Sequence, residues 1–503
     1  MKPLSIDKKT RQAPEILRFH LALAVLAAFI AAYLSGSLAA NSALEVLVKA
    51  QFSPLLYRGA AAGAVAAAAL TLVIGRGYCS VLCPLGTAQE LVFRAGAWLR
   101  KTTAKTSGSA SFPVRQGYAA PLPIRYAVPV IAAAAAACSL SPLGALIDPA
   151  AVFGRGMGAL RALFEGNLPA LAAVLGTPLF LMLFAAFFRG RWFCNWCPVG
   201  VTLGALSSFA PLGIALSPGC RSCGICEKIC PTGCISSRNG EKRLDYDRCV
   251  LCFSCVAACP GGSARFGLRK SSKTPGFPES RRAFLGKAAP LCCGAAYLAG
   301  ASLPARGLSL LRAVKMPDLA VLPPGAKNIQ NYASRCVGCC ACGAACPVRI
   351  ITLRSRLFPT LDFSRGACQY TCIECGKACP AGAIRRLSLE EKQRTRIARS
   401  DLNFRACVVN TRRESCGACA EVCPTRALYM APYAESGIPA LTRPLFDSLY
   451  CVGCGACFTA CPARPNAFII SAVPEQTRTA GIRPTREDED GAFLFKPADE
   501  FPF

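Results

Sequence analysis

Two cysteine runs decide the fold of the soluble part: CRSCGICEKICP at residues 220–231 and CVLCFSCVAACP at residues 249–260. In each run three cysteines are separated by two residues, and a fourth stands immediately before proline. Three thiolates at this spacing can wrap one cubane cluster, while the fourth points away and serves the partner run. The expected ligand sets are Cys220, Cys223 and Cys226 with Cys259, and Cys249, Cys252 and Cys255 with Cys230.

This spacing is the signature of bacterial ferredoxins, which bind [4Fe–4S] clusters. Zinc is the alternative, but four-thiolate zinc sites use two separated Cys-x2-Cys pairs rather than two complete runs of four. We therefore expect an α+β ferredoxin-type domain with two clusters at residues 215–265.

Four more runs at residues 330–472 predict a four-cluster ferredoxin domain. In the second of these runs three residues separate the first two cysteines, and in the third run eight residues do. These wider gaps indicate longer loops and no loss of ligands. Pairing the first run with the fourth and the second with the third would nest one ferredoxin inside another, and we prefer this to sequential pairing. The sixteen ligands are Cys336, Cys339, Cys342, Cys346, Cys368, Cys372, Cys375, Cys379, Cys407, Cys416, Cys419, Cys423, Cys451, Cys454, Cys457 and Cys461.

Composition excludes several other classes. The chain has 503 residues, of which 33 are cysteines. A chain of this length is too long for a small disulfide scaffold. The single histidine excludes histidine-rich zinc sites and multi-haem chains. The net charge of +29 suggests nucleic acid as a partner, but the basic residues are scattered and no nucleic-acid-binding motif accompanies them. We expect membrane lipid as a partner, and no nucleic acid.

Four apolar segments near the N-terminus predict membrane spans, at about residues 17–36, 58–75, 122–142 and 167–188. Buried helices of a soluble protein are the alternative. The expected fold class is a membrane α-helical domain at 1–200, with four spans as two repeated pairs, joined to the ferredoxin-type domains. Basic residues in the leader and in the loop at 76–121 predict that both are cytoplasmic.

The second and fourth segments end in similar elements, GRGYCSVLCPLG at 75–86 and RGRWFCNWCPVG at 189–200. Their cysteines, Cys79, Cys83, Cys194 and Cys197, could bind a seventh cluster between the two halves of the repeat. The alternatives are a redox-active dithiol and a structural role without metal.

The stretch SRRAFLGK at 280–287, followed by apolar residues to about 305, matches a twin-arginine export signal. The segment at 279–305 would then be a fifth span. This predicts a protein of the cytoplasmic (inner) membrane, multi-pass, with 215–265 cytoplasmic and 330–503 periplasmic. A chance Arg-Arg before a packing helix is the alternative. Residues 473–503 are predicted to form a polar tail.

Residues 1–265 resemble the NapH-type membrane polyferredoxin of periplasmic nitrate reduction, and its relatives in the nitrous-oxide and methylamine systems. The features that carry the likeness are the four apolar segments, the two Cys-Pro elements and the paired runs at 220–259. Residues 280–472 resemble the NapG-type partner, so the chain is similar to a fusion of the two. One departure is that the second Cys-Pro element is Cys-x2-Cys-Pro where the first is Cys-x3-Cys-Pro.

The resemblance implies quinol oxidation at the membrane, with electrons passed through the clusters to an exported or periplasmic oxidoreductase or cytochrome. No catalytic residue can be assigned; Asp148 is a candidate proton acceptor, with a turn residue as its alternative interpretation. Two other functions stay open: electron supply for maturation or reactivation of a metalloenzyme, and a relay that faces only the cytoplasm.

Overall fold

Helices fill the described parts of the first two hundred residues in the computed structural model. They are α1 (Lys8–Ser35), α2 (Leu38–Lys49), α4 (Ala61–Ile74), α5 (Tyr78–Val81), α6 (Pro84–Ser107), α9 (Pro149–Phe164), α11 (Pro178–Arg189), η1 (Phe193–Asn195) and α12 (Pro198–Ser207). Both α6 and α12 begin at the proline of a Cys-Pro element, because the fixed φ of proline suits the first helical position.

The structure describes residues 8–35, 38–49, 51, 61–107, 125, 127–128, 131, 147–164, 178–217, 220, 222–238, 241–269, 320–352, 358–433 and 441–484. The twin-arginine element at 280–287 and the predicted fifth span at 279–305 lie outside these residues.

The prediction of four membrane spans is wrong. Within the described residues one helix is long and apolar enough to cross a membrane, Arg11–Ser35 in α1. The predicted second span contributes α4, whose 14 residues end before Gly75, and the fourth contributes the 12 residues of α11. Within the described residues both are shorter than the ~20 residues that a span needs. Composition misled the prediction because hydropathy also selects apolar helices that are too short to cross a membrane. Most of the predicted third span lies outside the described residues.

One face of α1 packs into the protein. Arg18, Ala22, Leu26, Phe29 and Tyr33 recur at helical spacing and are all buried. Large apolar side chains on the opposite face are exposed.

The proximal ferredoxin-type unit follows α12. An outer antiparallel pair, β1 (Leu212–Leu216) and β4 (Ala264–Leu268), encloses both cysteine runs, and an inner pair, β2 (Ile235–Arg238) and β3 (Glu241–Leu244), lies between them. Each run supplies a short helix, α13 (Ile225–Ile229) and α14 (Ser254–Ala258). The α+β ferredoxin-type part of the fold prediction agrees with this arrangement.

The distal part repeats this plan in two units. The first contains α16 (Ile329–Arg335), α17 (Ala341–Ala344), β5 (Ile351–Thr352), β6 (Thr360–Leu361), η3 (Phe363–Arg365), α18 (Glu374–Ala378) and α19 (Leu389–Gln393). The second contains β7 (Thr395–Leu402), η4 (Phe404–Ala406), α20 (Val408–Thr411), α21 (Ala418–Glu421), β8 (Leu428–Pro432), β9 (Thr442–Phe446), α22 (Ala456–Ala460) and β10 (Phe468–Arg478). In the second unit β7 pairs with β10 around an inner β8–β9 pair. Because β10 extends to Arg478, it continues past residue 473, where the tail was predicted.

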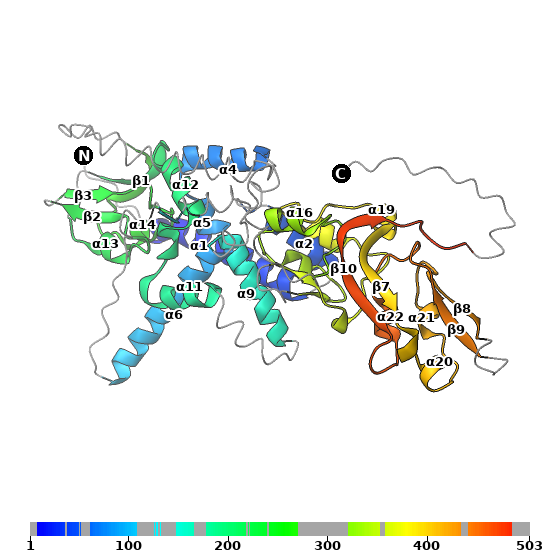
Figure 1. Cartoon of the computed structure of the whole chain (residues 1–503). Helices are drawn as coiled ribbons and strands as arrows, with labels where there is room; N and C mark the ends of the chain where they lie inside the picture. The colour runs from blue at the N-terminus through cyan, green and yellow to red at the C-terminus, as the bar shows by residue number, and fades with distance from the viewer. Residues whose placement is uncertain are drawn as a thin grey trace.

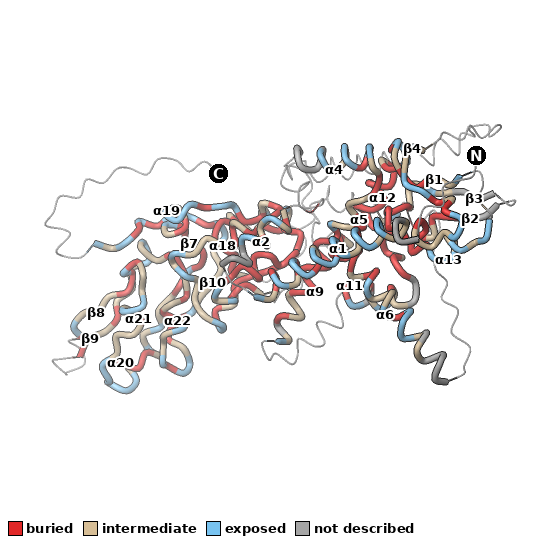
Figure 2. The backbone as a smooth tube through the Cα atoms, turned by 180° about the vertical axis from the view of Figure 1, so that it is seen from behind, coloured by how far each residue is buried: buried red, intermediate tan, exposed pale blue. Residues whose placement is uncertain are grey.

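The units form an elongated molecule with the proximal unit at one end, the second distal unit at the other and the helices between (Figure 1). One apolar core continues from the helices into the first distal unit, since Phe29 and Leu85 belong to the same cluster of buried residues as Ala341 and Ala378. Figure 2 shows buried backbone along this junction, near α1 and α9.

Candidate iron-sulfur centres

The proximal unit brings the cysteines of each run together. Cys220, Cys223 and Cys226 lie close enough to influence one another electrostatically, and Cys259 packs with Cys226 against one core. The other predicted set, Cys249, Cys252, Cys255 and Cys230, is equally close, because each of the other three raises the pKa of the buried Cys255.

A left-handed residue shapes each regular run. The residue after the second cysteine has positive φ in all four: Gly224, Phe253, Cys340 and Gly455. This conformation reverses the chain between the second and third thiols and turns all three toward one point. In the two stretched runs the corresponding residues, Ile373 and Gly417, have negative φ.

Three cavities of about 290 to 360 Å³ in the distal part are each lined by one set of cysteines. The sets are Cys336, Cys339, Cys342 and Cys379; Cys368, Cys372, Cys375 and Cys346; and Cys407, Cys416, Cys419 and Cys461. The remaining ligands form a fourth set, because Cys423 raises the pKa of Cys451, Cys454 and Cys457 alike.

The preferred nested pairing is therefore wrong, and the runs pair sequentially. The first run exchanges its fourth cysteine with the second, and the third exchanges with the fourth. The physical reason is the strand pairing, since β7 and β10 close around the last two runs and leave the first two in a separate unit. Spacing along the chain does not reveal these long-range hydrogen bonds.

The distal sites suit a group that binds thiolates. Burial raises the pKa of Cys457 to about 12 and that of Cys336 to about 11, although the Gly338 N–H opposes the rise at Cys336. Thiols held in their neutral form this strongly need a cationic group to become thiolates. In the described parts of the chain no three metal-binding side chains converge closely enough to share one ion. A cluster in which each thiolate binds its own iron fits this wider arrangement better than a single zinc ion.

The two Cys-Pro elements also meet. Cys79, Cys83, Cys194 and Cys197 are all buried and line one cavity of about 300 Å³, similar in size to the distal cavities. We call this the central cavity. Burial raises the pKa of Cys194 to about 11. The central thiols, like the distal ones, therefore suit a cationic group that binds thiolates.

Two fully buried arginines cross between the elements. Arg76, three residues before Cys79, donates to the carbonyl of Cys194 at 3.0 Å. Arg191, three residues before Cys194, donates to the carbonyl of Cys79 at 2.8 Å. Each arginine therefore fixes the loop of the opposite element, and the site has approximate two-fold symmetry.

A glycine in each element makes this crossing possible. A Cβ at Gly86 would lie 2.6 Å from the carbonyl oxygen of Cys79 and 3.5 Å from the Arg191 guanidinium. A Cβ at Gly200 would lie 2.7 Å from the guanidinium of Arg76. The sequence Cys-Pro-x-Gly is thus required for packing at both elements.

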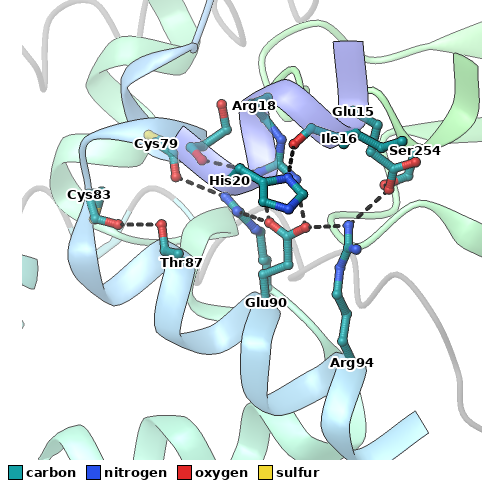
Figure 3. Close-up of polar contacts among 12 residues, drawn as sticks. Glu15, Ile16, Arg18, His20, Cys79, Cys83, Thr87, Glu90, Arg94 and Ser254 are labelled. Atoms are coloured by element: carbon teal, nitrogen blue, oxygen red, sulfur yellow. Dashed lines mark hydrogen bonds and ion pairs between the residues drawn. The ribbon is translucent and has the colours of Figure 1, made fainter. Parts of the chain in front are cut away.

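Glu90 joins this site to the proximal unit (Figure 3). Glu90 is a buried residue, 5% exposed, and its carboxylate forms ion pairs with Arg18, Arg94 and Arg191. Burial alone would raise its pKa, but Arg191 and the other guanidiniums outweigh burial and hold the pKa well below its usual value. Arg94 also pairs with Glu15 at 2.9 Å. Glu15 in turn accepts a hydrogen bond from Ser254, between two predicted ligands of the proximal unit, at 3.1 Å.

The first distal unit docks on α1 and α9. Tyr33 donates to the carbonyl of Cys339 at 2.9 Å, and Arg155 to that of Gly338 at 3.2 Å. Arg161 donates to the carbonyl of Ala344 at 2.9 Å. At Gly154 any Cβ would overlap the carbonyl oxygen of Cys339, so glycine allows the cluster loop to contact the helix.

Sequence reasoning missed the residues that hold these contacts. The arginine three residues before a cysteine in both elements was an available signal, as was the Gly154–Gly158 spacing on α9. Nothing in the sequence distinguishes Glu90 from an exposed helical glutamate. Asp148, the candidate proton acceptor, accepts the Ala151 N–H at 2.9 Å at the start of α9.

The chain was compared with known families. A family model described as a 4Fe-4S binding domain matches residues 59–105 and 170–213, which contain the four central cysteines. A model described as a 4Fe-4S dicluster domain matches residues 412–464. This second match agrees with sequential pairing, because it covers the whole fourth run and all of the third run except Cys407.

Several proteins are similar to parts of the chain. The methylamine utilization ferredoxin-type protein MauM of Paracoccus denitrificans is 29% identical over 39% of this chain and 85% of its own length. The ferredoxin-type protein NapF of Escherichia coli is 31% identical over 28% of this chain and 80% of its own length. The ferredoxin-type protein NapG of Haemophilus influenzae is 29% identical over 41% of this chain and 76% of its own length. No solved structure matches the chain.

Proposed function

Because the chain belongs to the family of ferredoxin-type iron-sulfur proteins represented by NapF, we propose that it is a membrane-attached electron relay that oxidises quinol and supplies an exported oxidoreductase. In this proposal a NapH-type module and a NapG-type ferredoxin are joined in one chain. When bound, each [4Fe–4S] cluster accepts and donates one electron.

The observation that carries the proposal is the serial arrangement of the cysteine sites. Cys194 and Cys252 both lie close enough to Arg191 to raise its pKa. Arg191 therefore connects the central cavity to the proximal unit. On the other side, Pro149 of α9 lines the central cavity, and Gly154 of the same helix touches the Cys339 loop. Five residues of helix separate these two contacts by about 7.5 Å.

The series continues through the distal part. The Cys368 N–H donates to the carbonyl of Cys454 at 2.8 Å, so the site that contains Cys368 adjoins the site that contains Cys454. The site at Cys407 and Cys461 is then the last, at the end of the molecule opposite the proximal unit (Figure 1). An arrangement in which every site has neighbours on both sides, except at the two ends, suits transfer of electrons from one end of the chain to the other.

The position of α1 supports a membrane location. Glu15 contacts the proximal unit and Tyr33 the first distal unit. Eighteen helical residues separate these contacts by about 27 Å, close to the ~30 Å of a bilayer hydrocarbon core. An α1 that crosses the membrane would hold 215–265 on the cytoplasmic side and 330–503 on the periplasmic side. Export through the twin-arginine element at 280–287 belongs to the same proposal.

Exposed apolar residues of the helical part support contact with lipid. Leu17 and Leu21 on α1, Leu70 on α4, Trp98 on α6 and Phe184 on α11 are each more than half exposed. Surfaces with this many large apolar side chains mark sites of membrane or protein contact.

The proposal is tested by mixing the purified, cluster-loaded protein anaerobically with a reduced quinol analogue in detergent. Rapid bleaching of the cluster absorbance is expected. Absence of bleaching, when dithionite bleaches the same sample, would refute quinol oxidation and favour electron supply from another donor. A reporter fused at the C-terminus tests the location, and a cytoplasmic signal would refute the exported relay.

A further inference from the structure

Gln89 of α6 is a buried polar side chain without a partner. It is fully buried and lines the central cavity, yet neither atom of its amide is hydrogen-bonded within the described residues. Native proteins satisfy nearly all buried polar groups. An orphaned amide in a cavity lined by four thiols therefore points to a ligand that accepts its N–H.

Arg76 gives a second, independent indication. The guanidinium is fully buried and donates to the carbonyls of Asp247 and Cys194, with Cys79 Sγ at 3.7 Å. Within the described parts of the chain, no carboxylate forms an ion pair with it. A buried charge without a counter-ion is strongly destabilising. This cost would be offset by an anion in the cavity.

Among the described residues that line the cavity, Arg76 is the one guanidinium and no carboxylate is present. Arg191, which also reaches the Cys79 loop, is already paired with Glu90. A [4Fe–4S] cluster with four thiolates carries two negative charges when oxidised and a third when reduced. Donors and positive charge beside such a cluster stabilise the reduced form more than the oxidised form.

We propose that Gln89 and Arg76 donate hydrogen bonds to a cluster held by Cys79, Cys83, Cys194 and Cys197, and that they raise its reduction potential. This inference rests on the proposed function, since it requires a cluster at the central cavity. A cluster held there would be reduced more easily than it would be without these two donors.

The test is a potentiometric titration of the full-length, cluster-loaded protein, followed by electron paramagnetic resonance. The signal of the central cluster is the one that a variant with all four central cysteines changed to serine lacks. Gln89→Leu removes the amide at similar volume, and Arg76→Lys keeps the charge but removes the forked donors. Gln51→Leu is the matched control, because Gln51 is equally buried but bonds to Tyr78 and Leu82 and does not line the cavity.

We expect Gln89→Leu and Arg76→Lys to lower the potential of the central signal, with the other signals unchanged and Gln51→Leu without effect. An unchanged potential in both variants would overturn the inference and leave the relay intact. If instead the wild-type protein and the serine variant contain equal iron and identical spectra, the central cavity holds no cluster, and both this inference and the central step of the proposed relay fail. Where Gln89→Leu loses iron from the central site, Arg76→Lys decides the outcome.

Discussion

The contact between α9 and the Cys339 loop gives the sharpest prediction, for Gly154→Ala. The added Cβ would overlap the carbonyl oxygen of Cys339 and lie 2.8 Å from its carbonyl carbon. Opening the carbon contact from 2.8 to an ordinary 3.4 Å moves the loop by at least 0.6 Å, and the oxygen requires more. The first distal unit must therefore shift away from the helix.

The magnitude follows from the hydrogen bonds that this shift breaks. The Tyr33 and Arg161 bonds are 2.9 Å long and the Arg155 bond is 3.2 Å, so a shift beyond 0.6 Å carries all three past the ~3.5 Å limit. Loss of three bonds at about 0.5–1.5 kcal/mol each costs roughly 2–4 kcal/mol. This corresponds to a roughly 30- to 700-fold shift from docked to undocked protein.

Gly158→Ala is the matched control on the same helix. Its Cβ would stand 3.4 Å from the Cβ of Cys340, an ordinary contact, while the gain in helix propensity is the same in both variants. Hydrogen exchange at residues 338–344 measures docking, and reduction of the distal clusters by a quinol analogue measures electron transfer. We expect Gly154→Ala to lose protection and to slow distal reduction, with its iron content unchanged. Equal behaviour of the two variants would refute the docking geometry.

Four further predictions concern the ion pairs and the cysteine sets. Glu90→Gln should destabilise the helical part by about 3–5 kcal/mol, because it leaves buried guanidiniums unpaired, and a thermal melt that does not shift would contradict this. The pKa of Glu90 is lower in the folded protein than in the unfolded chain, where it is about 4.3. The ionised carboxylate therefore stabilises the fold fully above about pH 4.3, and this stabilisation decreases as the pH falls below that value. Thermal melts across about pH 3–6 would show the decrease. Cys79→Ser with Cys83→Ser should lower the iron count from about 28 to about 24 per chain, and an unchanged count would show that these thiols hold no iron. Cys423→Ser combined with Cys451→Ser should lose about four irons, as either change alone does, whereas nested pairing requires a loss of about eight.

Sequence spacing was reliable where the chemistry is local. The first three thiols of a run lie within seven residues in the four regular runs and within thirteen in the stretched ones. Their grouping is therefore fixed by the backbone near them, and the structure brings each such group together. The membrane segments were misjudged because hydropathy reports composition alone. It cannot tell a helix that ends at Gly75 beside a buried arginine from one that continues through a bilayer.

By itself the sequence determined that the chain carries ferredoxin-type cysteine runs, with α+β units built around them. Only the tertiary structure decided which run completes which, since strand pairing between β7 and β10 joins residues about 70 apart in the chain. The central cavity is likewise a product of tertiary structure. Its cysteines come from two elements more than 100 residues apart, and two crossed arginines and two glycines bring them together because buried donors must find acceptors.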